Sequence, residues 1–194
     1  MKSKNFLALI VILCLLSAIT YFVLHQQQPN DSSDRMGNPL FKNFPLADVS
    51  AVTIAVKNQD SLQTVKLKRE DDQWIVKNRF DYPADFKSLS DVVRKLVESK
   101  IGRSFSASED SLSRLKLIPP DNKKVPSDQT ATRITFLAKK GNPLAGVLIG
   151  KNRDSSTAGP GGHYLMLADE NTVFLVDQTF NNLGTEPSDW IETE

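Results

Sequence analysis

Residues 51–77, "AVTIAVKNQDSLQTVKLKREDDQWIVK", decide the fold of this 194-residue chain. Apolar side chains alternate with polar ones over three short runs: Val52, Ile54 and Val56, then Val65 and Leu67, then Trp74 and Val76. Alternation of this kind is typical of strands with one buried face, and the intervening "NQD" and "EDD" are rich in turn formers. The stretch therefore predicts a three-stranded antiparallel meander. Trp74 could stack on a ligand, but its place in the alternation favours the core.

The period changes in residues 82–100, "YPADFKSLSDVVRKLVESK". Six apolar residues fall at helical spacing: Phe86, Leu89, Val92, Val93, Leu96 and Val97. Pro83 and Asp85 precede them as a helix start signal. We expect an amphipathic helix whose apolar stripe lies on one face of the meander.

The rest of the chain adds strands and one short helix. We expect a strand over residues 100–107, a short helix over 108–117 with Ser108 as its N-cap, hairpins across 140–142 and 168–171, and a helical turn over 178–184. Trp190 is expected to cap the core from the C-terminal tail. The predicted fold class is α+β, with an antiparallel sheet, one main amphipathic helix and one short helix.

An uncharged block of 19 residues runs from Phe6 to Leu24. As a helix it would measure about 28 Å, close to the roughly 30 Å of a bilayer core. Lys2 and Lys4 precede it and the next basic residue is Arg35, so the positive-inside rule places residues 1–5 in the cytoplasm. The block predicts a single-pass signal anchor in the cytoplasmic membrane, with the rest of the chain on the periplasmic or extracellular side.

Two alternatives concern this block. A cleaved signal peptide would usually have an apolar run of about 7 to 15 residues followed by a small-x-small site, and here the run is longer and ends in bulky residues. Lipidation of Cys14 would require small residues before it, where Ile12 and Leu13 stand. Because Cys14 is the only cysteine, the exported part cannot form an internal disulfide.

Residues 25–39 are polar, contain two prolines and predict a flexible tether, which leaves residues 40–194 as one exported domain. Only three of the 24 basic and two of the 23 acidic residues precede residue 40, so the domain carries 21 of each. A nucleic-acid-binding domain would normally have a basic excess. Nucleic acid is therefore not an expected partner.

Residues 148–167, "LIGKNRDSSTAGPGGHYLML", most resemble a chemical site. A phosphate-binding loop would require a lysine followed by Ser or Thr and then a helix, whereas Asn152 follows Lys151 and a strand is expected from about His163. With two histidines and one cysteine in the chain, neither a His/Cys metal site nor a cofactor is expected. His163 could be the base of a hydrolase, but no nucleophile motif accompanies it. We interpret Lys151, Arg153, Asp154 and His163 as a candidate interaction loop.

Several segments occur in an order that resembles a bacterial family, the domain of unknown function family 4340. They are Trp74 with Ile75, "YPAD" at 82–85, "LIGK" at 148–151, "GGHYL" at 161–165, "VFLVD" at 173–177 and "SDWI" at 188–191. The resemblance covers roughly residues 44–191. It implies one N-terminal membrane helix and, for some members, association with auxiliary components of gliding-motility-type ABC transporters. It implies no catalytic residues.

We therefore expect a non-catalytic, membrane-anchored envelope domain that binds a protein partner or supports a membrane transport complex. The resemblance implies an ABC transporter as that complex. The alternative is a small-ligand or glycan-binding module that uses the loop at residues 150–162.

Overall fold

The computed structural model of the protein describes residues 35–154 and 161–193. All of them belong to one compact unit. The expected anchor at residues 6–24 and most of the expected tether lie outside the described residues. None of the helices within the described ranges is long and apolar enough to cross a membrane.

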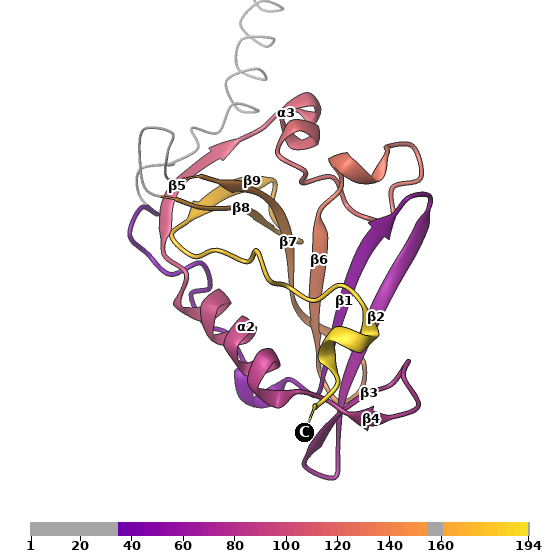
Figure 1. Ribbon diagram of the computed structural model, residues 1–194. Coiled ribbons are helices and arrows are strands. Elements are labelled where there is room, and N and C mark those ends of the chain that lie inside the picture. The colour runs from indigo at the N-terminus through magenta and orange to yellow at the C-terminus, as the bar shows by residue number, and fades with distance from the viewer. Residues whose placement is uncertain (1–34, 155–160, 194) are drawn as a thin grey trace, which may run out of the picture. The chain divides into compact units, whose positions relative to one another are not determined.

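The described residues form one antiparallel sheet of nine strands in the order β4-β3-β2-β1-β6-β7-β8-β9-β5 (Figure 1). The strands are β1 (Ala51–Asn58), β2 (Ser61–Glu70), β3 (Gln73–Val76), β4 (Tyr82–Pro83), β5 (Ile101–Ser106), β6 (Thr132–Leu137), β7 (Pro143–Arg153), β8 (Gly162–Leu167) and β9 (Thr172–Val176). The helices are α2 (Phe86–Glu98), α3 (Glu109–Arg114) and three 3-10 turns, η1 (Leu46–Asp48), η2 (Ser127–Gln129) and η3 (Pro187–Trp190). The predicted α+β class is confirmed for this part of the chain.

The predicted meander is β1, β2 and β3. Val52 lies opposite Leu67, and Leu67 lies opposite Val76, so the alternating apolar residues share one face. Asp71 and Asp72, between β2 and β3, have φ of 47° and 65°. Two consecutive positive φ values are typical of a type I′ turn, whose backbone twist matches that of the flanking strands. Asp tolerates positive φ better than most residues.

The same face continues across the sheet as the main core. Direct register partners form one buried row over five strands: Val65, Ile54, Ile134, Val147 and Leu167. Both α2 and the C-terminal segment, residues 177–191, pass across this face (Figure 1). Fully burying an aliphatic side chain contributes about 1.5 to 3 kcal/mol, so this row stabilises the sheet without any disulfide.

Helix α2 begins where the sequence predicts. The Asp85 side chain accepts hydrogen bonds from the backbone N–H of Ser88 at 3.0 Å and from its hydroxyl at 2.6 Å. These bonds hold the pKa of Asp85 below its usual value. Leu89 and Leu96 are buried against the sheet, whereas Phe86, at the start of the predicted apolar stripe, is 61% exposed.

The opposite face of the sheet carries a second, smaller core that the sequence did not predict. It consists of Leu117, Ala131, Leu148, Met166 and Val173, and α3 lies over it. The connection after α3 is fixed to the sheet by Lys57, whose buried ammonium donates to the backbone oxygens of Asn122 at 3.0 Å and Val125 at 2.6 Å. One face of the sheet therefore packs against α2 and the other against α3 and its connection.

Two irregular segments differ from the expectations drawn from the sequence. Residues 178–184, predicted as a helical turn, are a non-helical turn, and the helical turn falls instead at η3, where Pro187 fixes φ and Glu186 and Asp189 form a capping box. Trp190 is 2% exposed and caps the main core as predicted. Residues 35–39, placed in the tether by the sequence, bond to the start of β5 through Gly37 N–H to Ile101 O at 2.7 Å.

Candidate functional site

An apolar groove, which we call the α2 groove, runs between α2 and the meander and encloses about 470 Å³. Its helical wall consists of Phe86, Leu89, Ser90, Val93, Arg94, Val97 and Glu98, and its other wall of Leu46, Val49, Val52, Arg69 and Trp74. The helical wall repeats every three to four residues, so it follows one face of α2 from end to end. The groove is thus a direct consequence of the broad apolar stripe in the sequence.

The groove is open to solvent although it is largely apolar. Leu89 and Val52 form its buried floor, while Leu46 at the rim is 58% exposed and Phe86 is 61% exposed. Single exposed apolar residues are common, but a contiguous apolar groove with exposed bulky residues at its rim is typical of an interaction site. This is the site that best fits recognition of another molecule.

Three charged side chains line the α2 groove: Arg69, Arg94 and Glu98. Arg69 pairs with Asp72 and Arg94 pairs with Asp91, each at 2.7 Å. Neither aspartate lines the groove, and exposed pairs of this kind contribute little to stability. Both guanidinium groups can therefore exchange their present partners for an incoming carboxylate.

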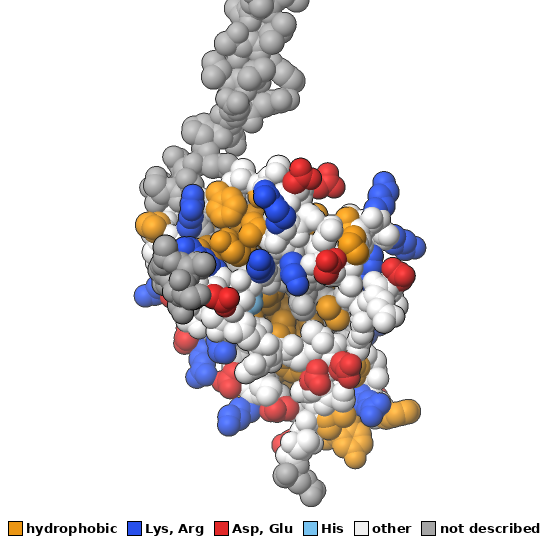
Figure 2. Space-filling view, turned by 45° about the horizontal axis from the view of Figure 1, so that its top comes forward, with side chains coloured by type: hydrophobic (Ala, Val, Ile, Leu, Met, Phe, Trp, Pro, Cys, Tyr) orange, Lys and Arg blue, Asp and Glu red, His pale blue; other side chains and the backbone are white. Residues whose placement is uncertain are grey.

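A second apolar feature lies at the turn between β3 and β4. The Phe80 side chain is 93% exposed and Tyr82 is 56% exposed. Phe80 and Asp81 have φ of 55° and 57°, and an ion pair between Lys77 and Asp81 at 2.9 Å spans the turn. In the space-filling view, hydrophobic side chains gather at the lower right, at this end of the sheet (Figure 2). The turn thus holds an aromatic ring in solvent, in a backbone conformation that bulky residues disfavour.

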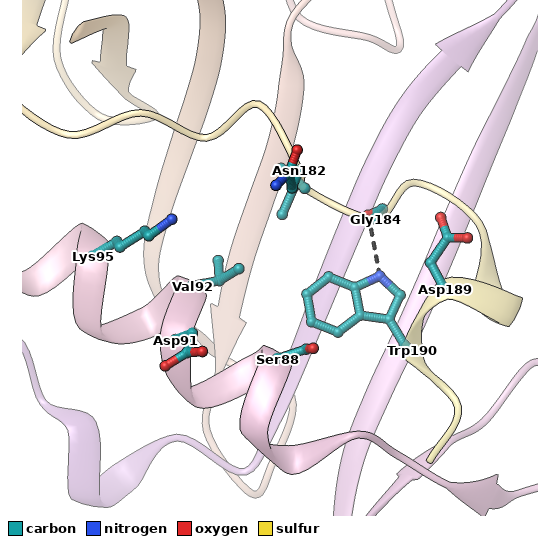
Figure 3. Close-up of a pocket in the computed structure, with 9 residues that line it drawn as sticks. Ser88, Asp91, Val92, Lys95, Asn182, Gly184, Asp189 and Trp190 are labelled. Carbon is teal, nitrogen blue, oxygen red and sulfur yellow. Dashed lines mark hydrogen bonds between the residues drawn. The ribbon is translucent and has the colours of Figure 1, made fainter. Parts of the chain in front are cut away.

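A polar cleft of about 490 Å³ lies on another side of α2, between that helix and the C-terminal segment. In Figure 3 the indole of Trp190 lies between the two, and the side chain of Lys95 points toward the C-terminal segment. The indole N–H donates to Gly184 O at 3.1 Å, and an Asp189 oxygen accepts from two backbone N–H groups at 3.0 and 2.9 Å. Trp190 and Asp189 therefore fix the C-terminal segment along this cleft.

The side chains of the predicted interaction loop do not come together as one site. Lys151 and Arg153 belong to β7, which extends to Arg153 and so into the loop expected at residues 150–162. The extension is possible because a bulge between Ile149 and Asn152 shifts the register, and Lys151 N–H then bonds to Leu115 O at 2.8 Å. The connection from β7 to β8 is therefore residues 154–161, shorter than the predicted loop at 150–162, and residues 155–160 lie outside the description.

His163 lies in β8 and is 5% exposed, whereas Lys151 and Asp154 are exposed. Its Nδ1 accepts a hydrogen bond from Phe180 N–H at 3.1 Å, which links β8 to the C-terminal segment. Burial lowers the pKa of the imidazole. The Nδ1 lone pair that a general base would use is therefore already occupied by the backbone.

The described residues contain no cluster suited to a metal ion. No group of three or more His, Cys, Asp or Glu side chains could hold a metal ion there. The hydroxyl of Ser88 does donate to a carboxylate of Asp85, but this is the cap of α2 and not a pair activated by a histidine. Compared with the polar cleft, the α2 groove has the more apolar lining.

Sequence reasoning did not find the α2 groove, although part of its signal was present. The six apolar positions on α2 form a stripe wider than one face of a sheet needs. Periodicity shows which residues are apolar, but it does not show whether the remaining ones are covered by another element. Leu46, which forms the opposite rim, comes from a segment without periodicity.

These features define a class: an antiparallel α+β domain with an open apolar groove beside its main helix. Residues 74–194 match the family called Domain of unknown function (DUF4340), and the match covers more than half of the chain. The chain belongs to this family. The resemblance drawn from the sequence is confirmed, and the matched range begins at Trp74, so it includes α2 and the C-terminal segment but not β1 or β2. No curated protein and no solved structure matches the chain.

Proposed function

We propose that this protein is a non-catalytic envelope domain, anchored in the cytoplasmic membrane by residues 6–24, that binds a protein partner through the α2 groove. The observation that carries the proposal is the open apolar groove, with Leu46 and Phe86 exposed at its rim. The uncharged 19-residue block and the lysines before it support the anchor and its orientation.

An accessory role in a membrane transport complex, of the ABC type, is the more specific form of this proposal. It is supported by the family resemblance and by the near-neutral exported domain, which suits contact with another protein better than with nucleic acid. The small-ligand or glycan-binding alternative has less support, because Lys151 and Arg153 lie along β7 while His163 faces the core.

The test uses the full chain in native membranes. Mild crosslinking, detergent extraction and purification are carried out for the wild type and for a Leu46→Ser, Phe86→Ser double variant. The control is Leu62→Ser, which changes an exposed leucine (47%) at the start of β2, the opposite end of the strand from Arg69 in the groove. The expected result is one discrete partner with the wild type and the control, and its loss with the double variant. Recovery of the chain alone, or a partner that the double variant retains in full, would overturn the proposal.

A further inference from the structure

We infer that the occupant of the α2 groove is an amphipathic helix of the partner protein, with an acidic residue placed against Arg94. This inference rests on the proposed function and specifies the partner's chemistry.

The backbone around the groove favours a helix over an extended segment. The wall opposite α2 comes largely from β1, β2 and β3, and β1 and β2 are paired with neighbours on both sides. Helix α2 satisfies its own backbone groups. An extended peptide in the groove would therefore bury N–H and C=O groups without partners, whereas a helix brings its hydrogen bonds with it.

The dimensions agree with a short helix. The helical wall extends from Phe86 to Glu98, twelve steps of about 1.5 Å, or about 18 Å. A partner helix of roughly three turns would match that length and would present apolar residues at i, i+3, i+4 and i+7. Val93 and Val97 are only partly buried, and they would complete their burial against such a stripe.

The charges give the partner a preferred sign. Two arginines and one glutamate line the groove, and the aspartates that pair with the two arginines lie outside its lining. Arg94 is 61% exposed in its side chain and holds only a short-range pair with Asp91 on the same helix. A glutamate or aspartate on the partner helix can bind this guanidinium without displacing any core contact.

The experiment measures binding of labelled synthetic peptides to the full chain in detergent. The first peptide, of about 14 residues, has leucines at helical spacing flanked by glutamates. The second replaces the glutamates by lysines, and the third keeps the leucines but carries two central prolines that prevent a helix. The protein variants are Arg94→Glu and, as the control with the same charge change, Arg114→Glu on α3. Adsorption of a given peptide to detergent is the same for all protein variants, so it cancels when the variants are compared with that peptide.

The glutamate peptide should bind the wild type and Arg114→Glu equally, and Arg94→Glu about three- to tenfold more weakly. The lysine peptide should show the reverse preference, and the proline peptide should bind at least about tenfold more weakly than the first. Equal binding of the proline peptide, indifference to Arg94→Glu, or no binding of any peptide would overturn the inference.

A photo-crosslinker at Ser90, an exposed groove residue, tests the inferred helix separately from the proposed function. Capture of a helical segment of another protein supports both. Capture of an extended segment keeps the proposed function and overturns the helix. Capture of a second copy of this chain overturns the helix of a separate partner, and no capture in membranes overturns the proposed function even where the peptides bind.

Discussion

At the scale of single residues, Phe80 combines strain with exposure. Its φ of 55° lies in the left-handed region, and its side chain is 93% exposed and belongs to neither of the two apolar cores. The left-handed conformation costs an ordinary residue about 1 to 2 kcal/mol, and less for Asn. A residue of this kind destabilises the folded chain, which is consistent with a role in contacts outside the chain.

We therefore predict that Phe80→Asn raises the free energy of unfolding by about 0.5 to 1 kcal/mol, because Asn accepts positive φ and no buried contact is lost. Chemical denaturation of the full chain in detergent measures it. Tyr82→Asn is the control, since Tyr82 lies in β4 and is not among the described residues with positive φ. A loss of stability in Phe80→Asn would show that the ring packs in a way its exposure does not reveal.

At the scale of elements, sequence and structure agree where the pattern is periodic. The meander follows from alternation, and α2 follows from its stripe together with Asp85, whose cap is present as expected. Sequence and structure differ at Gly150. The expected loop began at residue 150, but a bulge there carries β7 on to Arg153, and a Cβ at Gly150 would lie 2.4 Å from Leu115 O. Glycine is needed for close approach at this position, not for a flexible loop.

The link between β8 and the C-terminal segment should make folding sensitive to pH. His163 accepts from Phe180 N–H, and burial lowers its pKa, so the folded chain holds a neutral imidazole. The stability of this link is complete above the unfolded-state pKa of about 6.5 and is lost as pH falls through the lower folded-state pKa. The loss can reach at most about 1.4 kcal/mol per pH unit within that window.

His163→Asn keeps an acceptor for Phe180 N–H but removes the titration. Thermal unfolding at about pH 7.5 and pH 5.5 should show a smaller drop in Tm for the variant than for the wild type. His25 and all carboxylates are present in both proteins and cancel in the comparison. The same drop in both proteins would contradict the prediction, because it would mean that the pKa of His163 does not differ between the folded and unfolded states.

At the scale of the whole molecule, the composition and the order of the segments predicted the fold and the family, whereas the chemical motifs did not predict the site. The antiparallel α+β domain and its family were accessible because many short segments each obey a local rule and their order is specific. The second core was not accessible, since Leu117 and Ala131 come from segments without periodicity and meet β7, β8 and β9 only in three dimensions. The α2 groove could not be predicted for a related reason. A groove stays open only where no other element covers it, and periodicity does not show which apolar residues remain uncovered.

We predict that the mature protein keeps residues 6–24 as its membrane anchor. If residues 6–24 are a signal anchor, the mature protein retains its N-terminus, since the block is too long for a usual signal peptide and lacks a small-x-small site. Mass spectrometry of the protein purified from membranes should then find the intact chain, and alkaline carbonate should leave it in the membrane fraction. Replacing Leu13 and Leu16 by Arg should release it or prevent export, because each charge at the centre of a spanning helix costs about 2.5 to 3.5 kcal/mol. A mature protein that begins after residue 20 and is recovered in soluble form would replace the anchor by a cleaved signal, and the α2 groove would then act on a freely diffusing domain.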